Sequence, residues 1–409
     1  MKNNGLITGL DIGTTKIGVV VAEETESGSF RILGIGHAPA EGLKKGVVVN
    51  LEKTVDSIRQ ALDDAESVSG RKIESAYVGI SGEHIKSINS RGVIAIGKAG
   101  AEIIASDVGR ALEAAKAVTI PADREIIHML PQTYTVDEQN GIKDPVGFNG
   151  SRLEVDVHVV TGSASAIQNI LKCIDKCGIE IDELVLEPLA SSYAVLSRDE
   201  MELGCVVIDM GGLTTDLAVF HEGAVRHTAV VSLGGKNVTS DVAIGLRTPQ
   251  DQAEIIKCQH GSALASQVDA SEMVNVPGVA GRESKEVSKS VLASIIEPRM
   301  EEIFSLVARE LKKGHFSGTL AAGVILTGGA SQLVGAAELA EQIFDLPAKL
   351  GTPFNFENHM EINPGPAYAT GVGLIHYSLL SRPEVGSRMK AGGVSRIIEK
   401  FKRWLNEYF

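Results

Sequence analysis

The hydrophobic pattern opens with two short apolar runs on either side of a polar turn. Leu6–Leu10 and Ile17–Ala22 are mostly apolar, and the intervening Asp11–Lys16 reads DIGTTK. Apolar runs of this length, bounded by a glycine-containing turn, are typical of buried strands. We therefore predict that the chain begins with two strands joined at this turn.

The next segments predict a helix and then a region of different texture. Over Leu51–Val68, apolar residues recur at helical spacing, at Val55, Ile58, Ala61, Leu62, Ala65 and Val68. From His84 to Gly162, short alternating strands surround one helix, whose start is predicted at Ser106 and Asp107. A half-buried strand is indicated there by the alternation of Leu153, Val155, Val157 and Val159. We interpret this region as an inserted subdomain.

The N-terminal turn occurs a second time. Leu10–Thr15 reads LDIGTT, and Ile208–Asp216 reads IDMGGLTTD, within the strand-like segment Val206–Phe220. A spaced internal repeat of this kind predicts two lobes with related cores. The length of 409 residues agrees, because one hydrophobic core rarely supports so long a chain.

Composition and charge argue against some classes of protein, among them nucleic-acid binders and zinc proteins. The net charge of −13 argues against a nucleic-acid binder, which needs clustered Lys and Arg. The cysteines are not at zinc-ligand spacing, so we expect reduced thiols at Cys173, Cys177, Cys205 and Cys258. No signal peptide opens the chain, and no apolar stretch reaches the roughly 20 residues that cross a bilayer. We expect a cytoplasmic protein, soluble or peripheral to a membrane.

The repeated turns suit the chemistry of phosphate binding. A glycine turn presents backbone N–H groups to an anion, and Thr hydroxyls add donors. Asp11 and Asp209 stand where a carboxylate can hold hydrated Mg²⁺. The alternative is a structural double turn, since D-x-G also begins ordinary β-turns. The predicted phosphate-binding residues are Asp11, Gly13, Thr14, Thr15, Lys16, Asp209, Gly211, Gly212, Leu213 and Thr214.

A third glycine turn follows later in the chain. Val324–Ser331 reads VILTGGAS, which predicts a buried strand, a tight turn and then a helix. The bare backbone at Gly328 and Gly329, with Ala330 beside it, would let a base or ribose lie against it. The alternative is a helix start that needs glycine for packing.

The last residues are predicted to form a linker and an amphipathic helix. Arg382–Gly393 has no periodicity, whereas residues 394–409 carry one apolar stripe with basic edges. This pattern favours binding to an anionic membrane surface, and the alternative is a helix packed on the core. The predicted membrane-binding residues are Ile397, Ile398, Phe401, Lys402, Arg403, Trp404, Leu405 and Phe409. One such helix is a reversible anchor, so stable attachment calls for several acting together in a polymer.

Taken in order, these elements resemble a known superfamily. A phosphate turn, a connecting helix, a second phosphate turn, an adenosine turn and a second connecting helix follow one another as in the actin, sugar-kinase and heat-shock ATPase superfamily. The connecting helices would be Pro188–Leu196 and Pro366–Tyr377. Within it, essentially the whole chain resembles the FtsA family of bacterial actin-like division proteins. The stretches that carry this resemblance are Gly9–Lys16, Gly141–Gly147, Leu189–Leu196, Val238–Ala243, Ile296–Arg299, Leu326–Ala330 and the terminal helix.

The resemblance implies an α/β, actin-like two-lobed ATPase fold with an inserted α+β subdomain. The implied subdomains are IA (1–83 and 163–200), IC (84–162), IIA (201–232 and 318–381) and IIB (233–317), followed by the linker 382–393 and the membrane-targeting helix 394–409.

The resemblance also implies further contacts with ATP and Mg²⁺. Glu254 and Lys257 match a pair that contacts the ribose and base, although a surface pair at this spacing is the alternative. The turn Gly234, Gly235, Lys236 and Asn237 should sit near the phosphates or ribose. Leu213 departs from the pattern, which usually has a further Gly there. Glu187 stands where hydrolysing relatives keep an acid that orients water, or else it caps the helix before Pro188; ATP turnover therefore stays open, and slow at most.

The function implied by the resemblance is that of an ATP-dependent, polymerising adaptor on the cytoplasmic face of the cell membrane at the division site. Its implied partners are the C-terminal tail of the tubulin-like FtsZ, anionic lipids, other copies of itself, and later division proteins through IC. We expect the tail to dock on IIB around Glu297–Phe304, with Arg299 as a contact. The alternatives are a pilus-assembly scaffold of the same fold and a kinase of the superfamily.

Overall fold

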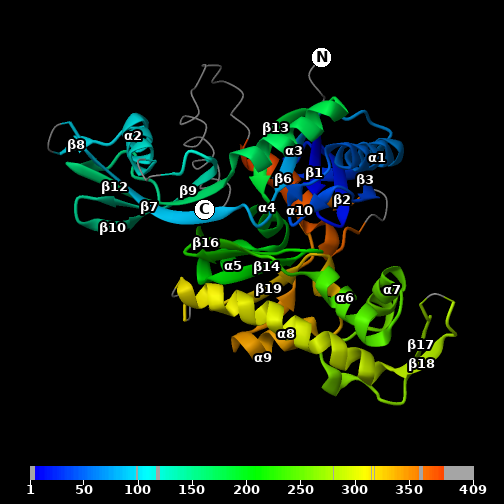
Figure 1. Ribbon diagram of the computed structural model, residues 1–409. Helices are drawn as coiled ribbons and strands as arrows, with labels where there is room; N and C mark the ends of the chain where they lie inside the picture. Colours follow the sequence, from blue (N-terminus) through cyan, green and yellow to red (C-terminus); the bar gives the residue numbers. More distant parts are fainter. Residues whose placement is uncertain are drawn as a thin grey trace.

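The computed structural model describes residues 5–97, 100–116, 120–279, 281–314, 316, 318–358 and 363–381. The predicted linker 382–393 and terminal helix 394–409 lie outside the described residues, so the expectations about them stay predictions. Two lobes are stacked in Figure 1, the first in blue above the second in green to yellow, and a cyan subdomain projects to one side.

The first lobe is built on a six-stranded mixed sheet. The strands, in spatial order, are β13 (Glu180–Leu186), β6 (Ser75–Ile80), β1 (Leu6–Ile12), β2 (Lys16–Glu24), β3 (Phe30–Pro39) and β21 (Glu357–Asn358). β1 pairs antiparallel with β2, as predicted, and parallel with β6. A small hairpin, β4 (Leu43–Lys44) with β5 (Val47–Val48), follows β3.

Four helices pack on the two faces of this sheet. α1 (Leu51–Ser69) and α3 (Ala164–Cys177) pack together, and α1 lies against β2 and β3. The predicted helix is confirmed: Asn50 Oδ1 accepts a hydrogen bond from the Lys53 amide at 3.1 Å, and Gly70 ends the helix in the left-handed conformation. The predicted apolar stripe is buried except at its end, where Val68 is 47% exposed.

The other two helices connect the lobes. α4 (Glu187–Val195) packs against α10 (Ala369–Ser381), which also contacts β1 and β6. The second predicted connecting helix is divided: Pro366–Tyr368 forms the 3₁₀ turn η3, and the α-helix starts only at Ala369. α4 and α10 approach each other closely where Gly373 has no side chain, because a Cβ there would overlap the Ala190 carbonyl.

The second lobe repeats the design of the first. Its sheet has the order β16 (Ala224–Val231), β15 (Thr215–His221), β14 (Cys205–Met210), β19 (Gly323–Thr327) and β20 (Ala348–Leu350). β14 and β15 form the repeated antiparallel hairpin, and β19 lies parallel to β14. The glycine turn after β19 is correctly predicted, but it leads into the 3₁₀ turn η2 (Gly329–Gln332), and the helix starts only at Ala336.

Helices and a hairpin complete this lobe. They are α5 (Arg198–Leu203), α6 (Gly235–Leu246), α7 (Gln250–His260), η1 (Ala265–Gln267), β17 (Met273–Val276), β18 (Lys285–Ser288), α8 (Lys289–Lys313) and α9 (Ala336–Phe344). α6, α7 and α8 pack on one another, and the β17–β18 hairpin lies beyond them at the edge of the molecule (Figure 1).

The inserted subdomain has its own hydrophobic core. Its sheet has the order β10 (Gln139–Ile142), β9 (Arg124–Val136), β12 (Arg152–Ser163) and β7 (Lys86–Ala95), with α2 (Ala105–Ala115) packed on it and β8 (Ala101–Glu102) paired with β11 (Asn149–Gly150). The helix begins at Ala105, one residue before the predicted start at Ser106. The Asp107 side chain caps this end by accepting a hydrogen bond from the Ile104 amide at 3.0 Å.

Half-burial of β12 was wrongly predicted. Leu153, Val155, Val157 and Val159 are all buried in the subdomain core, but His158 and Val160 on the opposite face are buried as well. That face packs against β16 of the second lobe, where His158 Nε2 lies 2.9 Å from Thr228 Oγ1. His158 Nδ1 lies 2.7 Å from Asn89 Oδ1 on the neighbouring strand β7. Alternation alone does not show that a polar residue is buried when the strand that covers it belongs to another domain.

This buried histidine predicts acid sensitivity. Burial, with a smaller contribution from His227, lowers the pKa of His158 to about 3. As the pH falls below about 6.5, the unfolded chain binds a proton at this position and the folded chain does not, so stability is lost. Between pH 7 and pH 5 we expect the free energy of unfolding of the wild type to fall by about 2 kcal/mol relative to His158→Gln.

The measurement is urea unfolding at both pH values. His37→Gln serves as the control, because His37 is exposed, and its profile should follow the wild type. Parallel profiles for the wild type and His158→Gln would contradict the prediction.

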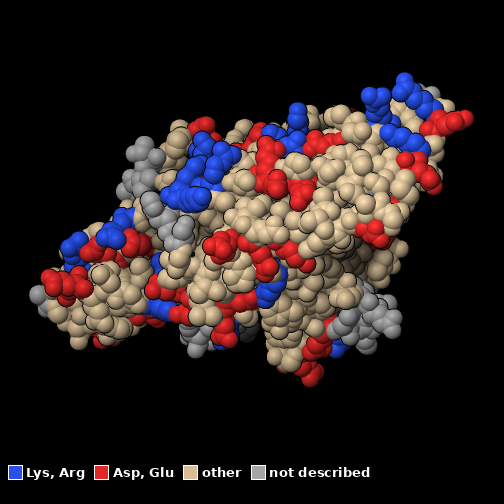
Figure 2. Space-filling view, turned by 90° about the horizontal axis from the view of Figure 1, so that it is seen from below, with Lys and Arg blue, Asp and Glu red and all other residues tan. Residues whose placement is uncertain are grey.

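The surface carries charges of both signs. On the face seen from below in Figure 2, Asp and Glu side chains lie among Lys and Arg, and wide stretches carry neither. The basic side chains form separate small groups on that face. The interpretation against nucleic-acid binding still rests on the net charge of −13.

Candidate nucleotide-binding site

A cavity of about 680 Å³ opens between the two lobes. Residues predicted from the sequence to bind nucleotide or to act there line most of it, from β1–β2, β14–β15, α4, α6, α7 and the turn after β19. They are Asp11, Gly13, Thr14, Thr15, Lys16, Glu187, Asp209, Gly211, Gly212, Thr214, Gly235, Lys236, Glu254, Lys257, Gly328, Gly329 and Ala330.

Three residues of the prediction are not among those that line the cavity: Leu213, Gly234 and Asn237. Gly234 lies behind the wall, where a Cβ would come within 2.6 Å of the Gly211 carbonyl oxygen. Asn237 Oδ1 accepts a hydrogen bond from the Gly234 amide at 3.0 Å, at the start of α6. Gly234 and Asn237 thus shape the turn and do not face the cavity.

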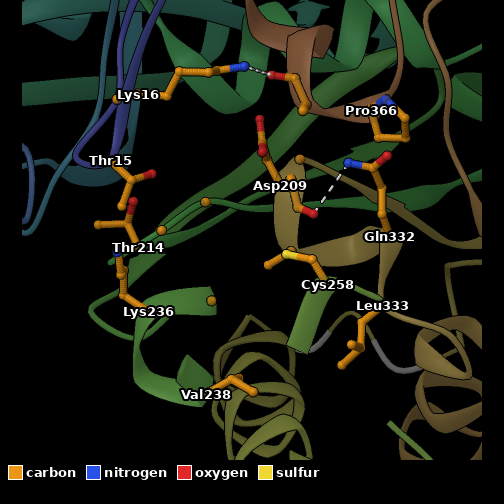
Figure 3. A pocket seen from close by; sticks show the side chains of 18 of the residues that line it. Thr15, Lys16, Asp209, Thr214, Lys236, Val238, Cys258, Gln332, Leu333 and Pro366 are labelled. Carbon is orange, nitrogen blue, oxygen red and sulfur yellow. Dashed lines mark hydrogen bonds between the residues drawn. The ribbon is translucent and has the colours of Figure 1, made fainter. Parts of the chain in front are cut away.

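The two phosphate turns meet across the cleft. Thr15 of the first turn contacts Gly212 of the second so closely that a Cβ on Gly212 would overlap the Thr15 side chain. The second turn is held to α6, because the Gly235 and Lys236 amides donate to the Gly211 and Gly212 carbonyls at 2.9 and 2.7 Å. Figure 3 shows Thr15, Thr214 and Lys236 along one side of the cavity.

Four carboxylates gather at the floor of the cavity: Asp11, Glu187, Asp209 and Asp216. Burial raises the pKa of Asp11 to about 7, with Lys16 opposing and Asp209 adding to the shift. Burial likewise raises the pKa of Asp216 to about 7, although a hydrogen bond from Ser81 opposes it. The pKa of Glu187 is raised well above its usual value by burial and then by the neighbouring acids.

This arrangement fits a hydrated cation. Asp209, at the end of β14, accepts a hydrogen bond from Thr370 Oγ1 at 3.1 Å, which orients its carboxylate. Among the residues that the structure describes, no three or more His, Cys, Asp or Glu side chains form a ready metal cage. Mg²⁺ keeps several waters and takes phosphate oxygens, so Asp11 and Asp209 suit it as acceptors for its bound waters.

Lys16 spans the cleft. Its Nζ donates to the Ala367 carbonyl at 2.7 Å (Figure 3) and stands 3.6 Å from the centre of the Tyr368 ring. Burial lowers the pKa of Lys16, with Asp11 and Asp209 opposing the shift. The phosphate turn of the first lobe is thereby tied to η3, beside the glycine turn after β19.

The far end of the cavity combines an ion pair with apolar side chains. Lys257 Nζ lies 2.9 Å from both carboxylate oxygens of Glu254, and Lys257 is only 8% exposed. The Glu254 side chain keeps 38% exposure, so the pair is buried on its lysine side and partly open on its carboxylate side. Val238, Met300 and Leu333 also line the cavity, next to Cys258, and such a surface suits a flat base.

Sequence reasoning missed several lining residues. Asp216, Thr370 and Pro366 stand within or beside motifs that were recognised, so their proximity to the turns was a usable signal. Val238, Met300 and Leu333 sit on helix faces or loops where apolar residues normally indicate core packing, and only the fold shows that they also face the cavity.

The chain has an actin-like ATPase fold. Two lobes with repeated cores are joined by crossing helices, and three glycine turns surround the cleft between them. Solved structures agree. The PilM–PilN type IV pilus biogenesis complex matches with a TM-score of 0.66 at 18% identity, over 92% of this chain and 99% of that one. MreB5 of Spiroplasma citri bound to ADP matches with a TM-score of 0.56 at 14% identity, over 91% and 95%. At these identities the likeness shows the fold.

The family follows from sequence comparison. A model of cell division protein FtsA matches residues 206–373, and a model of the SHS2 domain inserted in FtsA matches residues 82–161. Cell division protein FtsA of Pseudomonas aeruginosa is 46% identical over 100% of this chain and 99% of its own. That of Neisseria meningitidis serogroup B is 43% identical over 98% of both. The chain belongs to the FtsA family of cell division proteins, and the inserted subdomain is its SHS2 domain.

Over the described part of the chain, no helix combines the length and the apolar character that crossing a bilayer needs.

Proposed function

We propose that this protein binds Mg-ATP between its lobes and acts in cell division as a membrane-attached, polymerising adaptor for FtsZ. The observation that carries the nucleotide proposal is the meeting of three glycine turns and buried carboxylates in one cavity. Backbone amides of the turns, with Thr14, Thr15 and Thr214, would hold the phosphates. Asp11 and Asp209 would hold the waters of Mg²⁺.

Other lining residues would contact the ribose and the base of the nucleotide. Glu254 and Lys257 would contact the ribose and base, and the backbone at Gly328–Ala330 would lie along the adenosine. Glu187 faces the same cavity, and its raised pKa suits a group that orients water and accepts its proton. We propose at most slow hydrolysis.

The wider role follows from family membership and the terminal sequence. We assign IA, IC, IIA and IIB by the boundaries given above, with IC as the surface for later division proteins. Residues 394–409 would bind anionic lipid on the cytoplasmic face at the division site, and filament formation would turn weak anchors into avid binding. Full-length similarity to division proteins favours this role over a pilus scaffold or a kinase.

Vesicle co-sedimentation tests the proposal. The full chain and a chain ending at Gly393 are spun with anionic vesicles, each with and without Mg-ATP. We expect the shortened chain to lose binding and Mg-ATP to strengthen binding of the full chain. Equal binding by the two chains would remove the terminal helix as anchor. Binding unchanged by Mg-ATP would separate membrane attachment from assembly.

Arg299 is the proposed contact for the FtsZ tail. In the structure its Nε and Nη2 donate to Asp241 at 2.6 and 3.2 Å, and its Nη1 pairs with Glu302. A tail carboxylate would therefore compete with Asp241 for this guanidinium.

Replacing Arg299 by Glu should reduce tail-peptide affinity at least about tenfold, as measured by fluorescence anisotropy. The double variant Arg299→Glu with Asp241→Arg re-forms the internal ion pair and controls for misfolding; tail binding should stay lost. Unchanged affinity in the single variant would remove Arg299 from the interface.

A further inference from the structure

Thr239 lies one turn into α6, directly behind the wall of the cavity. It is fully buried, and it stands between the Gly235 turn at the start of α6 and the Glu254–Lys257 pair on α7. In Figure 3 its neighbour Val238 marks this part of α6. Thr239 is not among the residues that line the cavity, so any effect on a ligand acts through its neighbours.

One hydroxyl group connects all of these elements. Thr239 Oγ1 lies 2.9 Å from the Gly235 carbonyl oxygen and 3.1 Å from Lys257 Nζ, and it also hydrogen-bonds Glu254 Oε2. Lys257 Nζ donates in addition to the Gly235 carbonyl at 3.2 Å. The hydroxyl accepts a hydrogen bond from the Lys257 ammonium group and donates its proton to the Glu254 carboxylate, which fixes the pair on α7 against α6.

The network also fixes the charge of Glu254. Burial alone would raise the pKa of this carboxyl, but hydrogen bonds from Thr239 and Lys257 outweigh burial and hold the pKa below its usual value. The carboxylate is therefore ionised at neutral pH and lines the cavity as an acceptor. Its side chain keeps 38% exposure, whereas that of Lys257 keeps 10%.

We propose that Thr239 is a positioning residue that holds Glu254 and Lys257 in place to recognise the ribose hydroxyls, and so sets the preference for ribonucleotides over deoxyribonucleotides. The inference rests on the proposed nucleotide site. Without the Thr239 hydroxyl, the buried ammonium group loses an acceptor and the carboxylate loses a donor. The Glu254 carboxylate then turns further toward Lys257 and away from the ribose, since a buried charge takes the partner that remains.

The test compares Mg-ATP with Mg-2′-deoxyATP by isothermal titration calorimetry on the full chain. The wild type should prefer ATP, because a site built to bind a hydroxyl rejects the analogue that lacks it. Thr239→Val should lower the affinity for ATP by about tenfold and change that for deoxyATP little, so the preference collapses. Thr239→Ser keeps the hydroxyl and should keep the preference.

Thr248→Val is the matched control. Thr248 is also a buried threonine of this lobe, and its hydroxyl donates to the Pro277 carbonyl at 2.7 Å, outside the network. Its loss should leave the ATP preference intact at a similar cost in melting temperature. If Thr239→Val does not fold, Thr239→Ala replaces it.

Three outcomes would overturn the proposal. Equal loss of affinity for both nucleotides in Thr239→Val would show a merely structural role. Equal binding of ATP and deoxyATP by the wild type would remove ribose recognition while leaving nucleotide binding intact. Binding of neither nucleotide by the wild type would overturn the proposed nucleotide site, and this inference with it.

Discussion

Replacement of Asp209 by Asn should weaken binding of Mg-ATP by about 100-fold, the cost of removing one partner of a charge-assisted contact in a buried site. Asp209 ends β14 and faces the cavity, and it lies close enough to Lys16 and Asp216 to shift their pKa values. Asn has nearly the same shape and keeps one oxygen that can accept the hydrogen bond from Thr370 Oγ1, so the change removes the negative charge and one of the two acceptor oxygens that Thr370 and Ser191 use.

The metal dependence distinguishes this role from a structural one. With EDTA in place of Mg²⁺, Asp209→Asn should bind free ATP about as well as the wild type or more tightly, because the variant has one negative charge fewer facing the phosphates. Asp182→Asn, at an exposed position on β13, should bind Mg-ATP as the wild type does. An equal loss of affinity with and without Mg²⁺ would assign Asp209 to the fold and not to the cation.

The fold was largely predictable because its signals are local and repeated. The apolar runs around Asp11 and Asp209, the stripe of α1 and the glycine turn at Gly328 all act within a few residues of chain. The errors occur where distant parts meet. Val68 belongs to the predicted apolar stripe of α1 but is 47% exposed, and β12 was predicted to be half-buried although β16 covers the face that carries His158.

The site divides in the same way. The part of the lining formed by the glycine turns was predictable, because glycine, Asp and Thr together in a tight turn are typical of anion binding. The apolar part of the lining was not, because Met300 and Leu333 look like ordinary core residues. Thr239 and Glu254 are 15 positions apart, and Lys16 and Ala367 are 351 positions apart. The spacing of these residues in the sequence does not predict that they form hydrogen bonds.

A methyl group added at Gly212, between the two phosphate turns, should lower both the stability of the protein and its affinity for ligand. Gly212→Ala places a methyl group where Thr15 now packs, so the side chain must rotate or the lobes must separate. Overpacking of this kind costs about 1–3 kcal/mol. In the proposed nucleotide site the turns hold the phosphates from both sides, so we expect affinity for Mg-ATP to fall at least about tenfold in parallel.

A double-mutant cycle shows whether the clash with Thr15 is the cause. Thr15→Gly removes the side chain that the new methyl group meets. The loss of unfolding free energy caused by Gly212→Ala should therefore be smaller by at least about 1 kcal/mol in the Thr15→Gly background than in the wild type, as measured by urea unfolding. Gly97→Ala is the matched control, because a Cβ there meets nothing within 4 Å, and its unfolding free energy should stay within about 0.5 kcal/mol of the wild type. Additive costs in the cycle would mean that the two turns are not in contact in solution. The cleft would then be more open than the structure shows, and nucleotide would have to draw the lobes together before both turns could hold its phosphates.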